Sequence, residues 1–312
     1  MSDPVVLVDA VVKTFGDLRA LDELSFAAHE GEILGVLGPN GAGKTTVVHI
    51  LSTLLHPDAG QAHVDGYDTV AESEAVRRSI ALTGQFAAVD GELTGLENLV
   101  LFGRLLGLER NAARDRAGEL LASFSLTEAQ GRPAKTYSGG MRRRLDIAIS
   151  LMVPPRVLFL DEPTTGLDPR SRHDVWEVVE RLRADGVTIV LTTQYLEEAD
   201  RLADRIIVID RGRVIAEGTP SQLKTRTGPD QLVLTPTDVD PQALAGALDG
   251  FETTVGTETV SLPIDDGPRT VATAMAALGA AGIELADVAL RKPTLDDVFF
   301  NLTGHTTEAD DD

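Results

Sequence analysis

A glycine-rich segment that ends in lysine and threonine is the part of the chain best suited to chemistry. The residues that fit the pattern GxxxxGK[ST] and extend it by one are Gly38, Pro39, Asn40, Gly41, Ala42, Gly43, Lys44, Thr45 and Thr46. Glycines let backbone amides turn inward around phosphate oxygens, Lys44 reaches the β- and γ-phosphates, and Thr45 offers a hydroxyl to Mg²⁺. The segment follows an apolar run and opens a helical pattern, which favours a phosphate site over an ordinary glycine-rich turn.

Two adjacent carboxylates end another apolar run, at residues 157–160. Because neighbouring residues at a strand end point in different directions, Asp161 can hold Mg²⁺ while Glu162 orients or deprotonates a water molecule. Acidic residues after a buried strand are common by themselves. Paired with the glycine-rich loop, they predict a site for nucleotide hydrolysis.

A second candidate anion site comprises Ser138, Gly139 and Gly140, which stand between Tyr137 and Met141. A helical pattern follows, so the serine hydroxyl and the glycine amides are expected at a helix start, where anions bind well. One phosphate-binding loop does not need another, so this segment requires a separate explanation.

Short apolar runs that alternate with helical patterns must position these groups. The predicted strands of this part cover residues 5–10, 25–28, 33–37, 157–160, 188–192 and 206–209. Near-continuous apolar runs are typical of strands buried on both faces, and the alternation with helices predicts a mainly parallel sheet. A helix is predicted over residues 44–55 after the glycine-rich loop, and leucine periodicity over residues 95–126 predicts an all-helical insertion.

The chain is predicted to divide after residue 227, where Gly228, Pro229 and Asp230 interrupt the pattern. The remaining residues are expected to form a small α+β module with the order strand, helix, two strands, helix, strand, helix. The predicted elements lie at 232–234, 241–248, on either side of Gly256, and at 270–278, 287–290 and 295–302. A ferredoxin-like split βαβ arrangement satisfies this order.

The composition limits the classes of function. The 312 residues carry 28 basic and 49 acidic side chains, and the formal net charge of -21 opposes nonspecific binding to nucleic acid or anionic lipid. The absence of cysteine excludes disulfides and cysteine-based metal sites. No apolar run approaches the roughly 18–20 residues of a membrane-spanning helix, which predicts a cytosolic chain. Only five of the basic residues are lysines, which fits either a salt-rich cytoplasm or a GC-rich genome.

The glycine-rich loop, the paired carboxylates and the serine-glycine-glycine segment together resemble the motifs of ABC ATPases, in the family's order, over residues 1–227. The resemblance implies an α/β fold: a P-loop NTPase cassette with a RecA-like parallel sheet, an N-terminal antiparallel β part, and a helical subdomain at about residues 86–153. It also implies a head-to-tail dimer, formed by two copies of this chain or with another ATPase subunit. This dimer holds two ATP molecules, each between the glycine-rich loop of one subunit and the serine-glycine-glycine segment of the other, residues 138–140, which is called the signature segment below.

Three further residues match family positions. Gln85 corresponds to the Q-loop glutamine, which is expected to touch Mg²⁺ or the attacking water; the alternative is a solvated turn residue. Phe15 corresponds to the aromatic that stacks on adenine, and the alternative is a core side chain at a strand end. Asp168 corresponds to the D-loop aspartate that links the two ATP sites, although Asp-Pro would also start a helix well.

Two positions depart from the family's commonest forms. Gln194 stands where the family usually has the switch histidine; glutamine can donate a hydrogen bond to a γ-phosphate but cannot become a cation or relay a proton. Tyr137 and Met141 replace the leucine and glutamine of LSGGQ, while Ser138 and Gly140 are retained. We expect an active site in which hydrolysis is either slower or more dependent on Glu162.

The segments YSGGM and TTQYLEEAD, with the ending KPTLDDVF, resemble the daunorubicin-resistance group of ABC ATPases. That resemblance implies an ATP-hydrolysing exporter subunit at the cytoplasmic face of the membrane, held there by a separate permease that carries drugs or other hydrophobic compounds. The alternative is a nucleotide-dependent regulatory module with weak hydrolysis. Nucleic-acid maintenance is opposed by the charge and by the short helical insertion.

Overall fold

The computed structural model describes residues 4–84, 88–226, 228–264 and 267–303. The chain divides into two compact units, Met1–Pro220 and Ser221–Asp312. The boundary predicted after residue 227 therefore falls inside the second unit, a few residues from the observed division.

A six-stranded sheet forms the centre of the first unit, with the strand order β10-β9-β3-β8-β7-β6. Its strands are β3 (Ile33–Leu37), β6 (Ile80–Thr83), β7 (Val157–Asp161), β8 (Thr188–Thr193), β9 (Arg205–Asp210) and β10 (Arg213–Gly218). Neighbouring strands are parallel except β10, which pairs antiparallel with β9 at one edge. All residues of β3, β7 and β8 are buried, as their near-continuous apolar runs predict.

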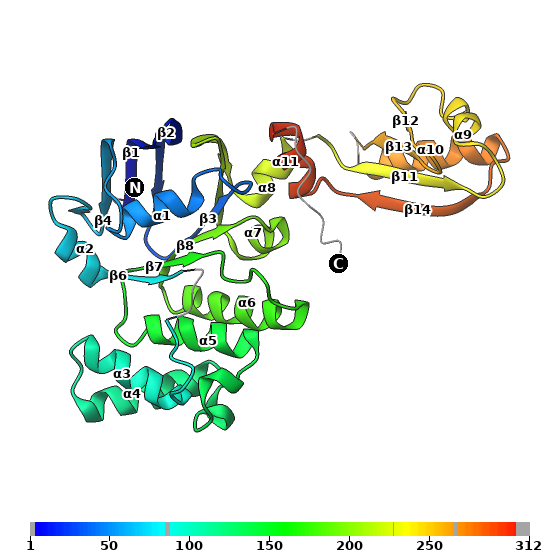
Figure 1. The fold of residues 1–312 in the computed structure, drawn as a ribbon. Helices are drawn as coiled ribbons and strands as arrows, with labels where there is room; N and C mark the ends of the chain where they lie inside the picture. The colour runs from blue at the N-terminus through cyan, green and yellow to red at the C-terminus, as the bar shows by residue number, and fades with distance from the viewer. Residues whose placement is uncertain (1–3, 85–87, 227, 265–266, 304–312) are drawn as a thin grey trace. The chain divides into compact units, whose positions relative to one another are not determined.

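A second sheet is antiparallel throughout and has the order β2-β1-β4-β5. It comprises β1 (Val6–Phe15), β2 (Leu18–Ala28), β4 (Ala59–Val64) and β5 (Tyr67–Asp68), and α2 (Ser73–Ser79) follows it. Together with α1 (Lys44–Leu51) it covers one face of the central sheet, because Val8, Val48 and Phe159 belong to one buried cluster. Figure 1 shows α1 between the two sheets. The predicted N-terminal antiparallel part is confirmed.

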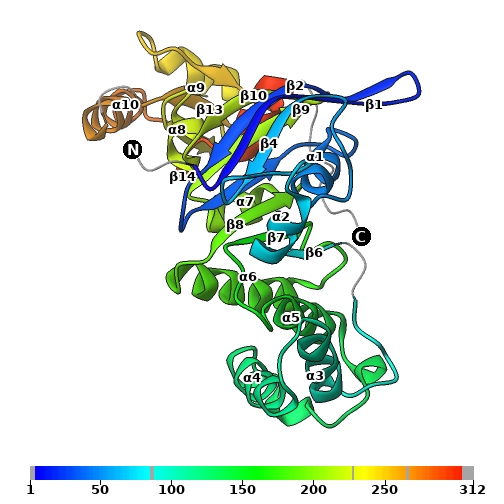
Figure 2. The same ribbon diagram turned by 90° about the vertical axis from the view of Figure 1, so that its left-hand side faces the viewer.

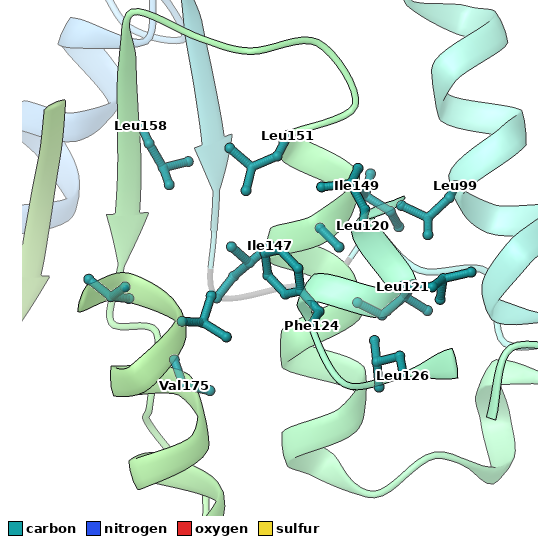
Figure 3. Packing of buried hydrophobic residues seen from close by; sticks show 14 of the residues in the cluster. Leu99, Leu120, Leu121, Phe124, Leu126, Ile147, Ile149, Leu151, Leu158 and Val175 are labelled. Atoms are coloured by element: carbon teal, nitrogen blue, oxygen red, sulfur yellow. The ribbon is translucent and has the colours of Figure 1, made fainter. Parts of the chain in front are cut away.

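Helices cover the opposite face of the central sheet. They are α3 (Gly95–Leu105), α4 (Arg110–Ser123), α5 (Gly139–Ser150), α6 (Pro169–Ala184) and α7 (Leu196–Leu202), with short 3-10 turns at Thr127–Ala129 and Ala134–Thr136. Figure 2 places α5 and α6 beside the sheet, with α3 and α4 farther out. Figure 3 shows the shared cluster, in which Leu99, Leu120 and Ile147 pack with Leu158 and Val175. The predicted helical insertion is thus fixed to the sheet through α5.

The helix after the glycine-rich loop is shorter than predicted. It ends at Leu51 rather than at residue 55. The hydroxyl of Ser52 donates to the carbonyl of Val48 at 2.8 Å, and Thr53 has φ +65°. A left-handed residue directly after a helix ends it, which the apolar pattern of the sequence did not reveal.

The second unit contains a four-stranded sheet with the order β12-β13-β11-β14, in which all neighbours are antiparallel. Its elements are α8 (Pro220–Thr225), β11 (Gln231–Pro236), α9 (Pro241–Ala247), β12 (Thr254–Val255), β13 (Val260–Pro263), α10 (Pro268–Ala280), β14 (Leu285–Arg291) and α11 (Leu295–Thr303). Leu232 and Leu262 of the sheet share a buried cluster with Leu244 of α9 and Leu278 of α10. This strand order is the ferredoxin-like one, which confirms the predicted arrangement.

Helix α11 of the second unit is amphipathic. In α11, Leu295, Val298 and Phe299 are buried, as its predicted apolar face requires. Among the described residues, no helix combines the length and the apolar character needed to cross a membrane.

Candidate functional site

Three neighbouring parallel strands deliver the predicted catalytic segments to one edge of the central sheet. The glycine-rich loop follows β3, Glu162 follows β7 and Gln194 follows β8, which lies between the other two. The register pairs Leu37 with Thr193, and Asp161 with Thr192, so the three strands end at nearly the same level. Ligands of open parallel sheets bind at the carboxyl ends of the strands, which makes this edge the candidate active site.

The glycine-rich loop is shaped by close backbone approaches. A Cβ on Gly38 would lie 2.3 Å from the carbonyl oxygen of Ile209, and Gly43, with φ +111°, directly precedes α1. Lys44 is only 4% exposed, and its Nζ donates to the carbonyl oxygens of Gly38 at 2.8 Å and of Pro39 at 3.1 Å. The loop therefore curls around its own lysine, in the shape that a phosphate cradle needs.

Lys44 also contacts Glu162, the predicted catalytic carboxylate. Its Nζ lies 3.4 Å from Oε1 of Glu162. Burial lowers the pKa of Lys44, while Glu162 and Asp161 raise it. The two carboxylates thus oppose the effect of burial on the pKa of Lys44.

Oxygen atoms suited to Mg²⁺ gather at Asp161, which is 2% exposed. Its Oδ1 accepts a hydrogen bond from Oγ1 of Thr45 at 3.3 Å and another from Oγ1 of Thr192. Neighbouring ligands of an octahedral Mg²⁺ are about 3 Å apart, and Mg²⁺ prefers oxygen donors. The hydroxyl of Thr45 and the carboxylate of Asp161 therefore fit one bound ion.

Glu162 has a backbone conformation that is unusual for its residue type. Its φ is +47°, and its amide donates to the carbonyl of Thr192 at 3.1 Å. Thr165 Oγ1 donates to its Oε2 at 3.4 Å. The two adjacent carboxylates consequently have different partners, Asp161 facing the threonine hydroxyls and Glu162 facing Lys44 and Thr165.

The serine-glycine-glycine segment begins a helix, as predicted. Ser138 is the N-cap of α5 and its Oγ accepts from the amide of Met141 at 3.2 Å. Tyr137 donates its hydroxyl to the carbonyl of Ala129 at 2.8 Å and is buried, so it packs in place of the family's leucine. Gly140 lies so close to α6 that a Cβ would be 2.5 Å from Oγ of Ser171.

The remaining predicted site residues lie at loop or strand ends. Phe15 ends β1, is 46% exposed and has Nζ of Lys13 5.7 Å from its ring centroid, so it is not a core side chain. Asp168 caps α6, and its carboxylate accepts from the hydroxyl of Ser171 at 2.6 Å and from the amide of Ser171 at 3.0 Å; these two hydrogen bonds lower its pKa. Gln194 is half-buried after β8. Gln85 lies outside the described residues.

Sequence reasoning missed two groups that the fold brings to the site. Thr192 was predicted only as part of the strand over residues 188–192, but its hydroxyl donates to the carboxylate of Asp161. Arg143 is buried between α5 and the end of β7, where its Nη2 donates to the carbonyl of Asp161 at 3.3 Å. The only signal in the sequence was a run of three arginines, which does not reveal that the middle one is buried.

Comparisons with known proteins agree with this geometry. Residues 21–165 match the sequence profile of the ABC transporter family. The chain is 52% identical to the doxorubicin resistance ATP-binding protein DrrA of Mycobacterium tuberculosis, over 98% of this chain and 96% of that protein. It is 51% identical to the daunorubicin/doxorubicin resistance ATP-binding protein DrrA of Streptomyces peucetius, over 96% of this chain and 92% of that protein.

A solved structure shares the fold of the first unit. It is the dimeric, post-hydrolysis state of the ATP-binding cassette MJ0796 bound to ADP and Pi, which is 28% identical and superposes with a TM-score of 0.62 over 69% of this chain and 98% of that one. The predicted P-loop NTPase fold, with its parallel core and helical subdomain, is thereby confirmed. The chain belongs to the ABC transporter family, as an ATP-hydrolysing, ATP-binding subunit of the daunorubicin-resistance group.

Proposed function

We propose that the chain couples ATP binding and hydrolysis to the export of drugs or other hydrophobic compounds through a separate membrane permease, at the cytoplasmic face of the membrane. The similarity to two drug-resistance proteins supports this, because it spans both units at about half identity. The match to these two proteins therefore includes the small second unit, whereas the solved cassette covers only 69% of the chain.

Hydrolysis is assigned to the edge where β3, β8 and β7 end. The loop amides and Lys44 bind the phosphates, and Glu162 accepts a proton from the attacking water while Gln194 donates a hydrogen bond to a γ-phosphate oxygen. Thr45 and Asp161, with Gln85, would hold Mg²⁺, which would neutralise charge on the β- and γ-phosphates. The contacts among Lys44, Glu162, Thr45 and Asp161 support these roles.

The second half of each ATP site is assigned to another subunit. In a head-to-tail dimer, the start of α5 with Ser138, Gly139 and Gly140 would contact the γ-phosphate held by the partner's loop. Asp168 would lie at the dimer contact, and Phe15 would stack on adenine. The dimeric relative supports this assembly, and the exposure of Phe15 leaves its ring open to a ligand.

The observation that carries the proposal is the 3.4 Å contact between Lys44 of the glycine-rich loop and Glu162, which joins the phosphate site to the candidate base.

Gln194 favours a second candidate function, a nucleotide-dependent regulatory module. Such a module would dimerise with ATP but turn it over very slowly, because glutamine cannot replace the charge of histidine.

ATP turnover by the purified chain, with and without the membrane protein encoded beside it, tests the proposal. We expect turnover that rises with the partner and falls by at least about 100-fold in Glu162→Gln, the size of effect that loss of a general base produces. Glu74→Gln serves as the matched control, since Glu74 is 74% exposed and pairs with Arg78 at the surface.

Two outcomes would redirect the assignment. Turnover retained in Glu162→Gln would remove the catalytic role of that residue. ATP-driven dimerisation without turnover, even beside the permease, would support the regulatory module.

A further inference from the structure

Arg143 lies one turn beyond the signature segment on α5, and its guanidinium is directed into the protein. The side chain is only 10% exposed. Nε donates to the carbonyl of Pro163 at 2.8 Å, and Nη2 donates to the carbonyl of Asp161 at 3.3 Å. Nη1 donates to the carbonyl of Gly84 at 2.7 Å and to the carboxylate of Asp146 at 3.4 Å. One buried side chain therefore joins α5 to two other segments of the chain.

The two carbonyls from Asp161 and Pro163 bracket Glu162. With φ +47°, Glu162 occupies a backbone region that costs a residue other than glycine roughly 1–3 kcal/mol and that persists only where its surroundings hold it. A pocket of about 240 Å³ lies beside it, lined by Gly139, Arg143 and Glu162 among others. The amide of Glu162 is held by Thr192 on one side, and the hydrogen bonds of Arg143 hold the carbonyls of the residues before and after Glu162 on the side of this pocket.

We propose that Arg143 is a positioning residue that transmits nucleotide contact at the signature segment to Glu162 of the same chain. This inference rests on the proposed function, in which Glu162 is the base and the signature segment faces the partner's ATP. The signature segment and Arg143 stand on one helix. Nucleotide bound at the start of α5 and the backbone around Glu162 are therefore joined through about one turn of α5 and one guanidinium.

The chemistry of the site requires arginine. The guanidinium is planar and has five N–H donors, which reach acceptors in several directions at once, whereas the three donors of lysine radiate from a single point. Asp146 balances the charge, and its Oδ1 also accepts from the amide of Ala88 at 2.9 Å. Burial raises the pKa of Asp146, while Arg143 opposes that rise.

A purely structural role for this ion pair is the competing explanation, and Arg144 provides the matched control. Arg144 is the next residue of α5, is 14% exposed on its side chain, and also pairs with a carboxylate, that of Asp174, while it bonds one carbonyl, that of Phe124, where Arg143 bonds three. Neither contact of Arg144 involves the segment around Glu162. Arg143→Lys and Arg144→Lys therefore make the same change at two largely buried, carboxylate-paired arginines of one helix, with different predicted consequences.

The experiment compares these variants in two measurements on the full chain. In steady-state hydrolysis, Arg143→Lys should lower kcat about 10-fold or more with little change in KM for ATP, whereas Arg144→Lys should leave kcat within about 2-fold. Combined with Ser138→Ala, Arg143→Lys should lower kcat much less than it does alone, because two changes in one coupled unit are not additive.

Hydrogen exchange with a non-hydrolysable ATP analogue separates this inference from the proposed function. Nucleotide should protect the amides of residues 161–167 in the wild type and in Arg144→Lys, but not in Arg143→Lys, while residues 38–46 are protected in all three. If the wild type lacks turnover yet shows this exchange pattern, the proposed function fails and the inference stands. Equal protection of residues 161–167 in both arginine variants would overturn the inference, whatever the turnover.

Discussion

Gln194 stands at the end of β8, between the strands that deliver the glycine-rich loop and Glu162. That position suits a side chain that contacts the γ-phosphate, but the amide of glutamine offers only a neutral hydrogen bond. The end of β8 therefore supplies no cation at this position, and Lys44 is the described cation that contacts Glu162.

Replacing Gln194 by histidine tests that view. We expect Gln194→His to raise kcat about 3- to 10-fold, because an imidazole can carry charge or relay a proton in the transition state. Gln194→Ala should lower kcat instead. Steady-state ATP turnover measures both, and a histidine variant no faster than the wild type would show that the native glutamine is not limiting.

Glu198 of α7 is fully buried, and its Oε1 accepts hydrogen bonds from Oγ1 of Thr164 at 2.9 Å and from Nε1 of Trp176 at 3.0 Å. Burial raises its pKa, against the effect of the hydrogen bonds and of Arg143. A carboxyl whose folded pKa lies above its unfolded value of about 4.3 stabilises the fold fully below that value and loses this contribution as pH rises through the folded pKa.

Glu198→Gln should therefore be at least as stable as the wild type at pH 8, and its stability should depend less on pH between 5 and 8. Urea unfolding at several pH values measures this. Glu197→Gln, an exposed neighbour on the same helix, is the control and should follow the wild-type curve. Parallel curves for the wild type and Glu198→Gln would show that Glu198 does not titrate in this range.

At the scale of elements, the start of α5 is held against the start of α6. Gly140 allows this approach, since a Cβ there would lie 2.5 Å from Oγ of Ser171, and Ser171 in turn donates to the capping Asp168 at 2.6 Å. The signature segment and the D-loop residue are thus packed as one unit within a subunit. A change at Gly140 disturbs both segments.

Gly140→Ala should lower the free energy of unfolding by about 1–3 kcal/mol, the usual cost of forcing extra volume into a packed site. It should also weaken ATP-driven dimerisation. Gly118→Ala is the matched control: Gly118 is an exposed residue of α4, a Cβ there would meet no described atom within 4 Å, and alanine should stabilise by about 0.5–1 kcal/mol. Equal effects of the two substitutions would contradict the packing argument.

At the scale of the whole molecule, the net charge of -21 sets the response to salt. Like charges destabilise a compact chain, and screening shortens their range from about 30 Å at 0.01 M salt to about 8 Å at 0.15 M. The described ion pairs are mostly at the surface, where each one stabilises little by itself. Repulsion between like charges is therefore the dominant salt-dependent contribution to the stability of the folded chain.

Raising KCl from 0.01 M to 0.15 M should raise the thermal unfolding midpoint by about 2–4 °C for each kcal/mol of repulsion removed, as measured by circular dichroism. A midpoint that falls with KCl would contradict the argument.

ATP turnover that keeps rising to molar KCl would favour the salt-rich cytoplasm as the cause of the low lysine content. A plateau near 0.2 M would favour the GC-rich genome instead.

The sequence by itself determined the segments whose structure is local. The glycine-rich loop, the helix start at Ser138 and the buried strands could be predicted, because glycine spacing, capping residues and continuous apolar runs restrict the backbone of the segment that carries them. The order of elements also sufficed for the ferredoxin-like arrangement of the second unit, because few topologies satisfy it. The end of α1 could not be predicted, since it depends on the left-handed backbone of Thr53.

Only the tertiary structure decided which residues meet around Glu162. Arg143 and Arg144 are adjacent in sequence and equivalent in type, yet of the two only Arg143 contacts the carbonyls on either side of Glu162, the proposed base. The left-handed backbone of Glu162 and the hydroxyl of Thr192 on Asp161 also come from strand neighbours distant in sequence. Local patterns specify how a segment is built, but the contacts that align a site arise from the packing of separate segments against one another.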